Sequence, residues 1–292
     1  MKLLHRLFIF LYGLSMVLAT GSAIAVPMLY GLNPFENDSS FPGLRQISSV
    51  DGSDITTQVI TLAGKTVTGG NGLATNPLTG EMYAVLKLNG QQGRELVKLN
   101  PLTGTATSIG DTGERLAALT FDSAGTLYGV SGDGGFTPAT LFTIGLLDAS
   151  LTPFATLGAG NDGEAIAFNS ADGKIYHASG LGLPNVSEIF ESIDLVTKVI
   201  TPITLTGFDY DELFSMVWDP TQNLFLGSDI DSFFLSISAT GTVTDLGDLT
   251  GFEDLRGLAF FDPNFGAVPE PATLALFSLG LLGLGFSRRK KV

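Results

Sequence analysis

The 292-residue chain contains no cysteine. Disulfide bonds are therefore excluded, even for a chain in an oxidising compartment, and so are thiolate chemistry and cysteine-ligated zinc. Histidine is almost absent as well, since only His5 and His177 occur. One histidine without cysteine builds a zinc centre only together with carboxylates. We therefore interpret His177, which follows Tyr176 in an expected strand, as a structural residue.

Basic residues are scarce between the two ends of the chain. Six of the 15 Lys and Arg residues are Lys2, Arg6 and positions 288–291, so nine remain against nearly all of the 29 acidic residues. A surface this acidic attracts cations and repels anionic lipid. It also lacks the basic face that binding to nucleic acid requires, so we expect no nucleic-acid partner.

Helical spacing of apolar residues is missing between Val26 and Pro263. Short alternating runs broken by Gly, Asn and Asp recur there, which is typical of an all-β domain. A unit repeats within this region: Thr75, Phe121, Phe168 and Trp218 are equivalent positions, separated by 46, 47 and 50 residues. Each copy has an apolar strand, a turn with Asn or Asp, a second strand and two further strands. Four strands in roughly 40–50 residues form a β-propeller blade.

The two ends of the repeat region complement each other. Residues 254–261 read as a first strand with no second strand after it, and residues 27–32 as a second strand with no first strand before it. Residues 44–47 and 58–62 supply the third and fourth strands. We therefore predict a five-bladed β-propeller at 26–263, closed by one blade that both termini share, which removes a free sheet edge.

The propeller prediction has one main rival, a β-sandwich, which would not need similar copies at a fixed period. The region resembles the broad class of bacterial extracytoplasmic propellers with YVTN-like or WD-like blades. Four aromatic residues are interpreted as core between blades, with a role as ligand platforms as the alternative: Tyr83, Tyr128, Tyr176 and Trp218.

The N-terminal segment, residues 1–25, has the order of a secretory signal peptide. A positive start with Lys2 and Arg6 precedes an apolar stretch at 7–18, and Ala23 and Ala25 frame a small-x-small cleavage site. We expect a signal helix, export through the Sec machinery and cleavage by signal peptidase after Ala25. An uncleaved anchor is the alternative.

The C-terminal segment, residues 268–292, follows a linker at 264–267 and has three parts. The first is the motif Val268, Pro269, Glu270 and Pro271, in which the prolines prevent a helix and leave a stiff, exposed strip. The second is an apolar run at 272–286, which we expect to form a transmembrane helix. The third is a basic stop that stays at the cytoplasmic face, made of Arg288, Arg289, Lys290 and Lys291.

This three-part order resembles the PEP-CTERM sorting signal of Gram-negative bacteria, also labelled the ice-binding-protein C-terminal domain. The resemblance implies processing by an exosortase, a membrane transpeptidase that depends on cysteine, and export to a surface rich in exopolysaccharide. We expect a chain tethered to the inner membrane through 272–286 before processing and located at the cell surface or in the extracellular matrix afterwards. A plain C-terminal anchor is the alternative.

Carboxylates gather in the loops before four of the expected first strands. In a propeller these loops share one rim, where carboxylates would either stay solvated or bind a hard cation such as Ca²⁺. The first of these loops contains Asp111 and Glu114. The residues of the other three loops are predicted as a calcium site: Asp162, Glu164, Asp209, Asp211, Glu212, Glu253 and Asp254. Asp229 and Asp231 are interpreted as turn residues, with surface calcium ligands as the alternative.

Two hypotheses about function follow. The first is a non-enzymatic surface or biofilm-matrix protein without a cofactor, whose propeller is a binding or structural module with exopolysaccharide as a candidate partner. It fits the absence of G-x-S-x-G, H-E-x-x-H and phosphate-loop motifs. The second is a Ca²⁺-dependent hydrolase or lyase that uses the rim carboxylates on extracellular polysaccharide or phosphate ester.

Overall fold

The computed structural model describes residues 27–33, 43–132, 134–157, 164–180, 188–249 and 255–266. Pro27–Asp262 form one compact unit. The other unit comprises 1–26 and 263–292, and only residues 263–266 of it are described. The expected signal helix and C-terminal helix therefore lie outside the described residues. No helix long and apolar enough to cross a membrane is found among the residues that are described.

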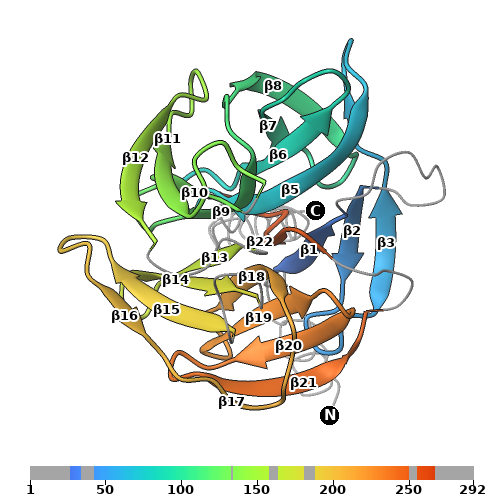
Figure 1. The fold of residues 1–292 in the computed structure, drawn as a ribbon. Coiled ribbons are helices and arrows are strands. Elements are labelled where there is room, and N and C mark those ends of the chain that lie inside the picture. Colours follow the sequence, from blue (N-terminus) through green and yellow to red (C-terminus); the bar gives the residue numbers. More distant parts are fainter. Residues whose placement is uncertain are drawn as a thin grey trace, which may run out of the picture. The chain divides into compact units, whose positions relative to one another are not determined.

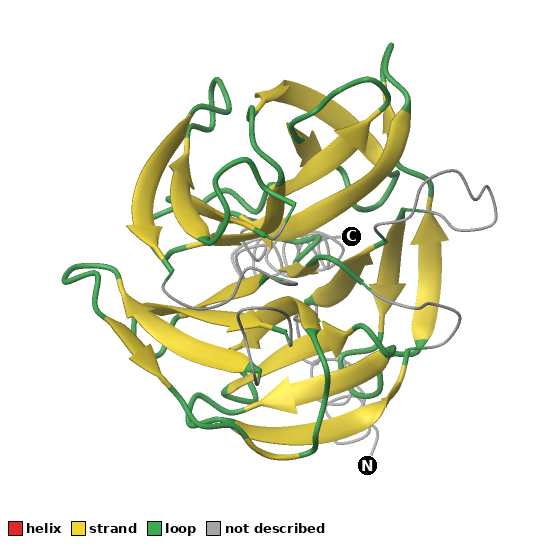
Figure 2. Cartoon of the chain, in the orientation of Figure 1, coloured by secondary structure: helices red, strands yellow, loops and turns green. Residues whose placement is uncertain are grey.

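Strands and loops make up the whole described part of the chain (Figure 2). The strands form five sheets, which we number as blades in chain order. Blade 1 consists of β5 (Val67–Thr75), β6 (Met82–Leu88), β7 (Glu95–Leu99), β8 (Thr105–Asp111) and β4 (Thr61–Leu62). Blade 2 consists of β9 (Leu116–Phe121), β10 (Leu127–Ser131), β11 (Thr140–Ile144) and β12 (Leu151–Thr156).

The other three blades follow the same plan. Blade 3 consists of β13 (Ala165–Asn169), β14 (Lys174–Ser179), β15 (Ile189–Asp194) and β16 (Ile200–Pro202). Blade 4 consists of β18 (Leu213–Asp219), β19 (Leu224–Asp229), β20 (Phe233–Ile237), β21 (Thr242–Asp248) and β17 (Thr206–Gly207). Blade 5 consists of β22 (Leu258–Phe261), β1 (Met28–Leu32), β2 (Leu44–Ile47) and β3 (Asp54–Gln58).

The five blades form a closed ring (Figure 1). The innermost strands β5, β9, β13, β18 and β22 contact one another in that order, and β22 contacts β5 again. The last blade joins the two ends of the unit, because β1 pairs antiparallel with β22, with Met28 opposite Phe261 and Gly31 opposite Leu258. The predictions of five blades and of a blade shared by the termini are confirmed.

Two features of the outer strands differ from the prediction. The fourth strand of blade 5 is β3, at Asp54–Gln58, rather than 58–62. Most of β3 is exposed, so it lacks the apolar alternation by which a half-buried strand is recognised. The apolar residues Ile60 and Leu62 belong to the connection into blade 1, where β4 pairs parallel with β8. Similarly, β17 pairs parallel with β21, so these two connections add a fifth strand to the blade that follows.

The turns between first and second strands form as their residues predict. The side chain of Asn76 accepts a hydrogen bond from the backbone of Leu78 at 2.8 Å, and Asn169 does the same for Ala171 at 2.8 Å. Such side chains stabilise tight turns by satisfying backbone donors that the sheet leaves free. This local chemistry explains why the repeat can be recognised at a fixed place in each unit.

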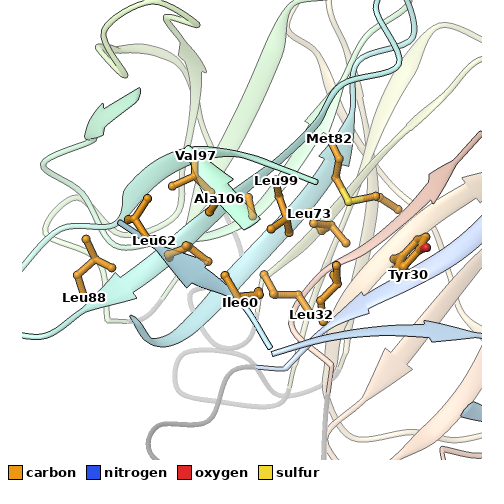
Figure 3. Packing of buried hydrophobic residues seen from close by; sticks show 14 residues of the cluster. Tyr30, Leu32, Ile60, Leu62, Leu73, Met82, Leu88, Val97, Leu99 and Ala106 are labelled. Atoms are coloured by element: carbon orange, nitrogen blue, oxygen red, sulfur yellow. The ribbon is translucent and has the colours of Figure 1, made fainter. Parts of the chain in front are cut away.

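The hydrophobic core lies in five seams, one between each pair of neighbouring blades. Figure 3 shows the seam between blades 5 and 1, where Tyr30 and Leu32 face Leu73 and Met82. Aromatic rings meet across other seams, with Tyr83 and Phe121 5.3 Å apart. The rings of Tyr176 and Phe225 lie 4.7 Å apart across the seam between blades 3 and 4. The interpretation of four aromatic residues as core between blades is confirmed, since all belong to these seams: Tyr83, Tyr128, Tyr176 and Trp218.

Gly72 on β5 lies against β9 and against the residues just before β22, and we expect its replacement by alanine to destabilise the ring. Its φ is +61°, and an added Cβ would lie 2.9 Å from the backbone nitrogen of Leu119. The left-handed conformation and the forced backbone shift together should cost about 2–3 kcal/mol in the free energy of unfolding. Urea unfolding of the purified protein measures this.

Gly64 provides the matched control for this prediction. Its φ is +72°, but no atom lies within 4 Å of an added Cβ. Gly64→Ala should therefore show the conformational cost alone, about 1 kcal/mol. Equal losses for both variants would mean that the close approach at Gly72 contributes nothing to stability.

Candidate functional site

We call the edge of the propeller at which each innermost strand begins the entry rim. In blades 2–4 it consists of the residues just before β9, β13 and β18 and just after β10, β14 and β19. Of the predicted acidic residues, those that the structure describes just before β9, β13 and β18 lie on this rim: Glu114, Glu164, Asp209, Asp211 and Glu212. Buried Glu114, however, accepts hydrogen bonds from the backbone of Phe136 at 2.6 Å and of Thr137 at 2.9 Å. Its carboxylate therefore holds the loop of its own blade.

Glu164, at the start of blade 3, belongs to a buried cluster that also contains His177 and Glu191. His177 on β14 is fully buried; its Nδ1 lies 3.0 Å from Oε1 of Glu191 on β15, and its Nε2 contacts Oε2 of Glu164. Both glutamates are almost fully buried as well. The cluster thus connects three neighbouring segments of blade 3.

The register shows that this cluster is particular to blade 3. His177 lies opposite Ile166 of the innermost strand. The other blades have small residues at the corresponding place, namely Gly31, Ala84, Gly129 and Gly227. An added methyl group at any of the three glycines would lie within 3.1 Å of a leucine side chain, from Leu255, Leu116 and Leu213 respectively. Blade 3 therefore has a charged cluster where three of the other blades pack leucine on glycine.

His177 is charged at neutral pH. Burial alone would lower the pKa of its imidazole, but the charge of Glu164 and the hydrogen bonds to Glu164 and Glu191 outweigh burial and raise this pKa to about 9. Both ring nitrogens of the imidazolium then donate a hydrogen bond, one to each carboxylate. Two negative charges and one positive charge are buried together, and Oε1 of Glu164 has no hydrogen-bond partner.

Position and burial favour a structural role for this cluster. The Glu164 side chain also packs toward blade 2, since a Cβ added at Gly132 would lie 3.3 Å from its Cγ. All three side chains are withdrawn from solvent. The cluster connects segments of blade 3 and lies at the seam with blade 2. This agrees with the interpretation of His177 as a structural residue.

The remaining predicted calcium residues are only partly described. Asp209 and Asp211 are exposed on the entry rim before β18, and Glu212 is half-buried there. Asp162, Glu253 and Asp254 lie outside the described residues. Among the residues that the structure places, no three His, Asp or Glu side chains are arranged to hold a metal ion. The seven-residue calcium site stays a prediction.

Sequence reasoning missed Glu191 as a site residue, and one signal for it was available. Successive residues of a strand point to opposite faces, so Glu191 shares a face of β15 with Ile189 and Ile193. A carboxylate between two isoleucines on one face indicates a buried group that needs a partner. Its partner His177 lies directly opposite in the pairing of β14 and β15, which only the register reveals.

Asp229 has the predicted turn role but is not at the surface. Its Oδ1 accepts a hydrogen bond from the backbone of Phe233 at 2.7 Å, which closes the turn between β19 and β20. The side chain is fully buried, and Oδ2 has no hydrogen-bond partner. The hydroxyl of buried Tyr210, just before β18, has none either.

Comparisons with known proteins identify the tail and the fold. The model of the PEP-CTERM protein-sorting motif matches residues 267–290, a stretch that contains Pro269, Glu270 and Pro271. No curated protein matches the chain. Among solved structures, a chain from "Crystal structure of Nidogen/Laminin Complex" matches with a TM-score of 0.51 and 10% identity over 81% of this chain and 99% of that chain.

The structural match supports the fold alone, because the two sequences are so different. The sorting motif implies an exported chain that an exosortase processes and that is sorted to the cell surface. The motif follows the propeller in the sequence, so the propeller is the part of the chain that the motif sorts. The chain is therefore a five-bladed β-propeller protein with a PEP-CTERM protein-sorting motif at its C-terminal end.

Proposed function

We propose that the propeller is a non-enzymatic binding or structural module of an exopolysaccharide or biofilm matrix, delivered to the surface by its C-terminal motif. The observation that carries the proposal is the combination of a sorting motif with a rim on which two buried carboxylates, those of Glu114 and Glu164, hold other groups of blades 2 and 3. Glu114 holds backbone amides, and Glu164 holds His177. Carboxylates occupied in this way are not available for acid–base catalysis, which requires them within reach of a substrate.

The route to the surface is part of the same proposal. The signal segment at 1–25 directs export and is cleaved after Ala25, and the apolar run at 272–286 holds the chain in the inner membrane until the exosortase acts. The order of a stiff motif, an apolar run and a basic stop supports this sequence of events, since Arg288 to Lys291 oppose translocation of the tail.

Replacing Pro269, Glu270 and Pro271 by alanine in the native host tests the routing. We expect the variant to accumulate as an unprocessed, membrane-associated form, because the alanines allow a helix through the stiff strip that the processing enzyme recognises. Immunoblots of membrane, surface and culture fractions measure this.

Pro263→Ala serves as the control, because Pro263 precedes the matched residues 267–290. It should be processed and located like the wild type. Processing and location that stay unchanged after replacement of the three motif residues would contradict the sorting proposal.

The alternative function is a Ca²⁺-dependent hydrolase or lyase acting on extracellular polysaccharide or phosphate ester. The exposed carboxylates Asp209 and Asp211 are the residues on the described rim that favour it. Turnover of such substrates with CaCl₂, lost in Asp211→Asn, would support the enzyme; saturable polysaccharide binding without turnover would support the binding module.

A further inference from the structure

An exposed aromatic ring lies on the entry rim of blade 2. Phe136, between β10 and β11, is 56% exposed, and among the described residues of the propeller unit it is the one exposed phenylalanine. A large apolar side chain left in water forgoes the free energy that burial would gain. The guanidinium of Arg115, just before β9, lies over this ring, with Cζ 5.0 Å from the ring centroid. We call these two side chains the Phe136–Arg115 platform.

A second pair of the same kind shows how such a stack looks when it only closes the core. The guanidinium carbon of Arg256 lies 3.9 Å from the ring centroid of Phe214, and Phe214 is 5% exposed. Beside Arg115, in contrast, more than half of Phe136 stays exposed. The platform therefore keeps aromatic surface that a ligand can cover.

Both members of the platform are fixed by one buried carboxylate, that of Glu114. Its Oε1 accepts hydrogen bonds from the backbone N–H of Arg115 at 2.7 Å and of Phe136 at 2.6 Å, and its Oε2 accepts one from Thr137 at 2.9 Å. Glu114 is 4% exposed, and burying a carboxylate is costly unless its oxygens are hydrogen-bonded. These bonds set the backbone positions of ring and guanidinium together, so the platform is formed before any ligand binds.

The guanidinium of Arg115 connects two loops and keeps donors for a ligand. Its Nε donates to the backbone oxygen of Gln92 at 3.3 Å and its Nη2 to Oε1 of Gln92 at 3.0 Å, while its Nη1 donates to the backbone oxygen of Gly134 at 3.2 Å. Gln92 lies in the loop between β6 and β7, so these bonds reach blade 1. A guanidinium has five N–H groups. The three bonds to described residues therefore leave two N–H groups beside the exposed ring.

We propose that the Phe136–Arg115 platform binds a neutral hexopyranose unit of a polysaccharide. The C–H face of a pyranose ring packs on an aromatic ring, and the sugar hydroxyls accept hydrogen bonds from the guanidinium. An uncharged polymer fits better than a polyanion, because the chain carries 29 acidic residues against 15 basic ones. A platform that is already ordered loses little freedom on binding. This inference rests on the proposed function as a binding module and names its ligand class and its binding residues.

The test is native electrophoresis of the purified full-length protein, in a detergent without sugar groups, through gels that contain a polysaccharide. Dextran, hydroxyethyl cellulose and galactomannan are the neutral polymers, and polygalacturonate is the anionic one. We expect at least one neutral polymer to retard the wild type. Phe136→Ala should raise the dissociation constant about tenfold, and Arg115→Gln about threefold. Leu147→Ala, which truncates a 96% exposed side chain at the other end of β11, should bind like the wild type.

Two further variants separate stacking on the ring from a general apolar contact. Phe136→Leu keeps apolar surface but has no flat ring, so it should lose as much affinity as Phe136→Ala. Phe136→Trp keeps a flat ring and should bind at least as well as the wild type. The urea midpoint of all three Phe136 variants should match that of the wild type, because the side chain is exposed.

The outcomes distinguish this site from the proposed function. Retardation by a neutral polymer that Phe136→Ala or Phe136→Leu retains in full would overturn the platform and leave polysaccharide binding by the propeller in place. Retardation by polygalacturonate alone would do the same. A wild type that none of the four polymers retards would overturn both the platform and polysaccharide binding.

Discussion

His177→Leu is expected to lower the free energy of unfolding by about 3–5 kcal/mol at pH 7, since removing one partner of a buried charge cluster leaves the others uncompensated. The two glutamates of this cluster are 1% and 4% exposed, so water cannot replace the imidazolium. Both would lose their hydrogen bond to the ring, and two negative charges would then lie near each other in the interior. Urea unfolding of the purified full-length protein measures the loss.

Neutralising the glutamates should restore much of this stability. When Glu164→Gln and Glu191→Gln are added to His177→Leu, no buried charge is left in the cluster. Replacing a complete buried ion cluster is often close to neutral, whereas removing one member is not. The triple variant should therefore recover at least half of the loss. A His177→Leu protein within 1 kcal/mol of the wild type would show that the cluster does not hold blade 3 together.

The number of blades and the closure of the ring could be predicted because both depend on local signals. The Asn or Asp turn after each first strand recurs at a nearly constant interval, and the predicted strands at 27–32 and 254–261 are each an incomplete part of one unit; the second of them is found at 258–261. Strand β3 could not be recognised, because its residues are largely exposed and show no apolar alternation. Its pairing is fixed instead by β2, where Arg45 donates hydrogen bonds to both oxygens of Asp54 at 2.8 and 2.7 Å.

The candidate sites were harder to predict, because their members come from different strands. Glu164 was recognised as acidic and near the rim, but its side chain contacts His177, thirteen residues later, whose other ring nitrogen contacts Glu191 on the next strand. Asp229 was predicted to be a turn residue, and its Oδ1 does accept the hydrogen bond that closes the turn. The sequence did not indicate that its Oδ2 is buried without a hydrogen-bond partner. Register and burial decide what a carboxylate does, and neither follows from spacing in the sequence.

The stability of the wild type should fall by about 3 kcal/mol between pH 6.5 and pH 9.5 because of His177. Its pKa is about 9 in the folded protein and near 6.5 in the unfolded chain. A raised pKa means that the folded state holds the proton more tightly. The stabilisation is therefore fully present below about pH 6.5 and is lost as the pH rises through 9. Urea unfolding at half-unit steps of pH measures the decline.

His177→Leu isolates this contribution, because few other shifted groups titrate in the same window. The raised pKa of Asp229, about 6, lies below it, and the raised pKa values of Tyr30, Tyr83 and Tyr128 lie above it. The advantage of the wild type over the variant should consequently shrink with pH, as the imidazolium loses the charge that offsets Glu164 and Glu191. Curves that stay parallel from pH 6.5 to 9.5 would mean that His177 is already neutral at pH 7, and the cluster would then be held by hydrogen bonds without its positive charge.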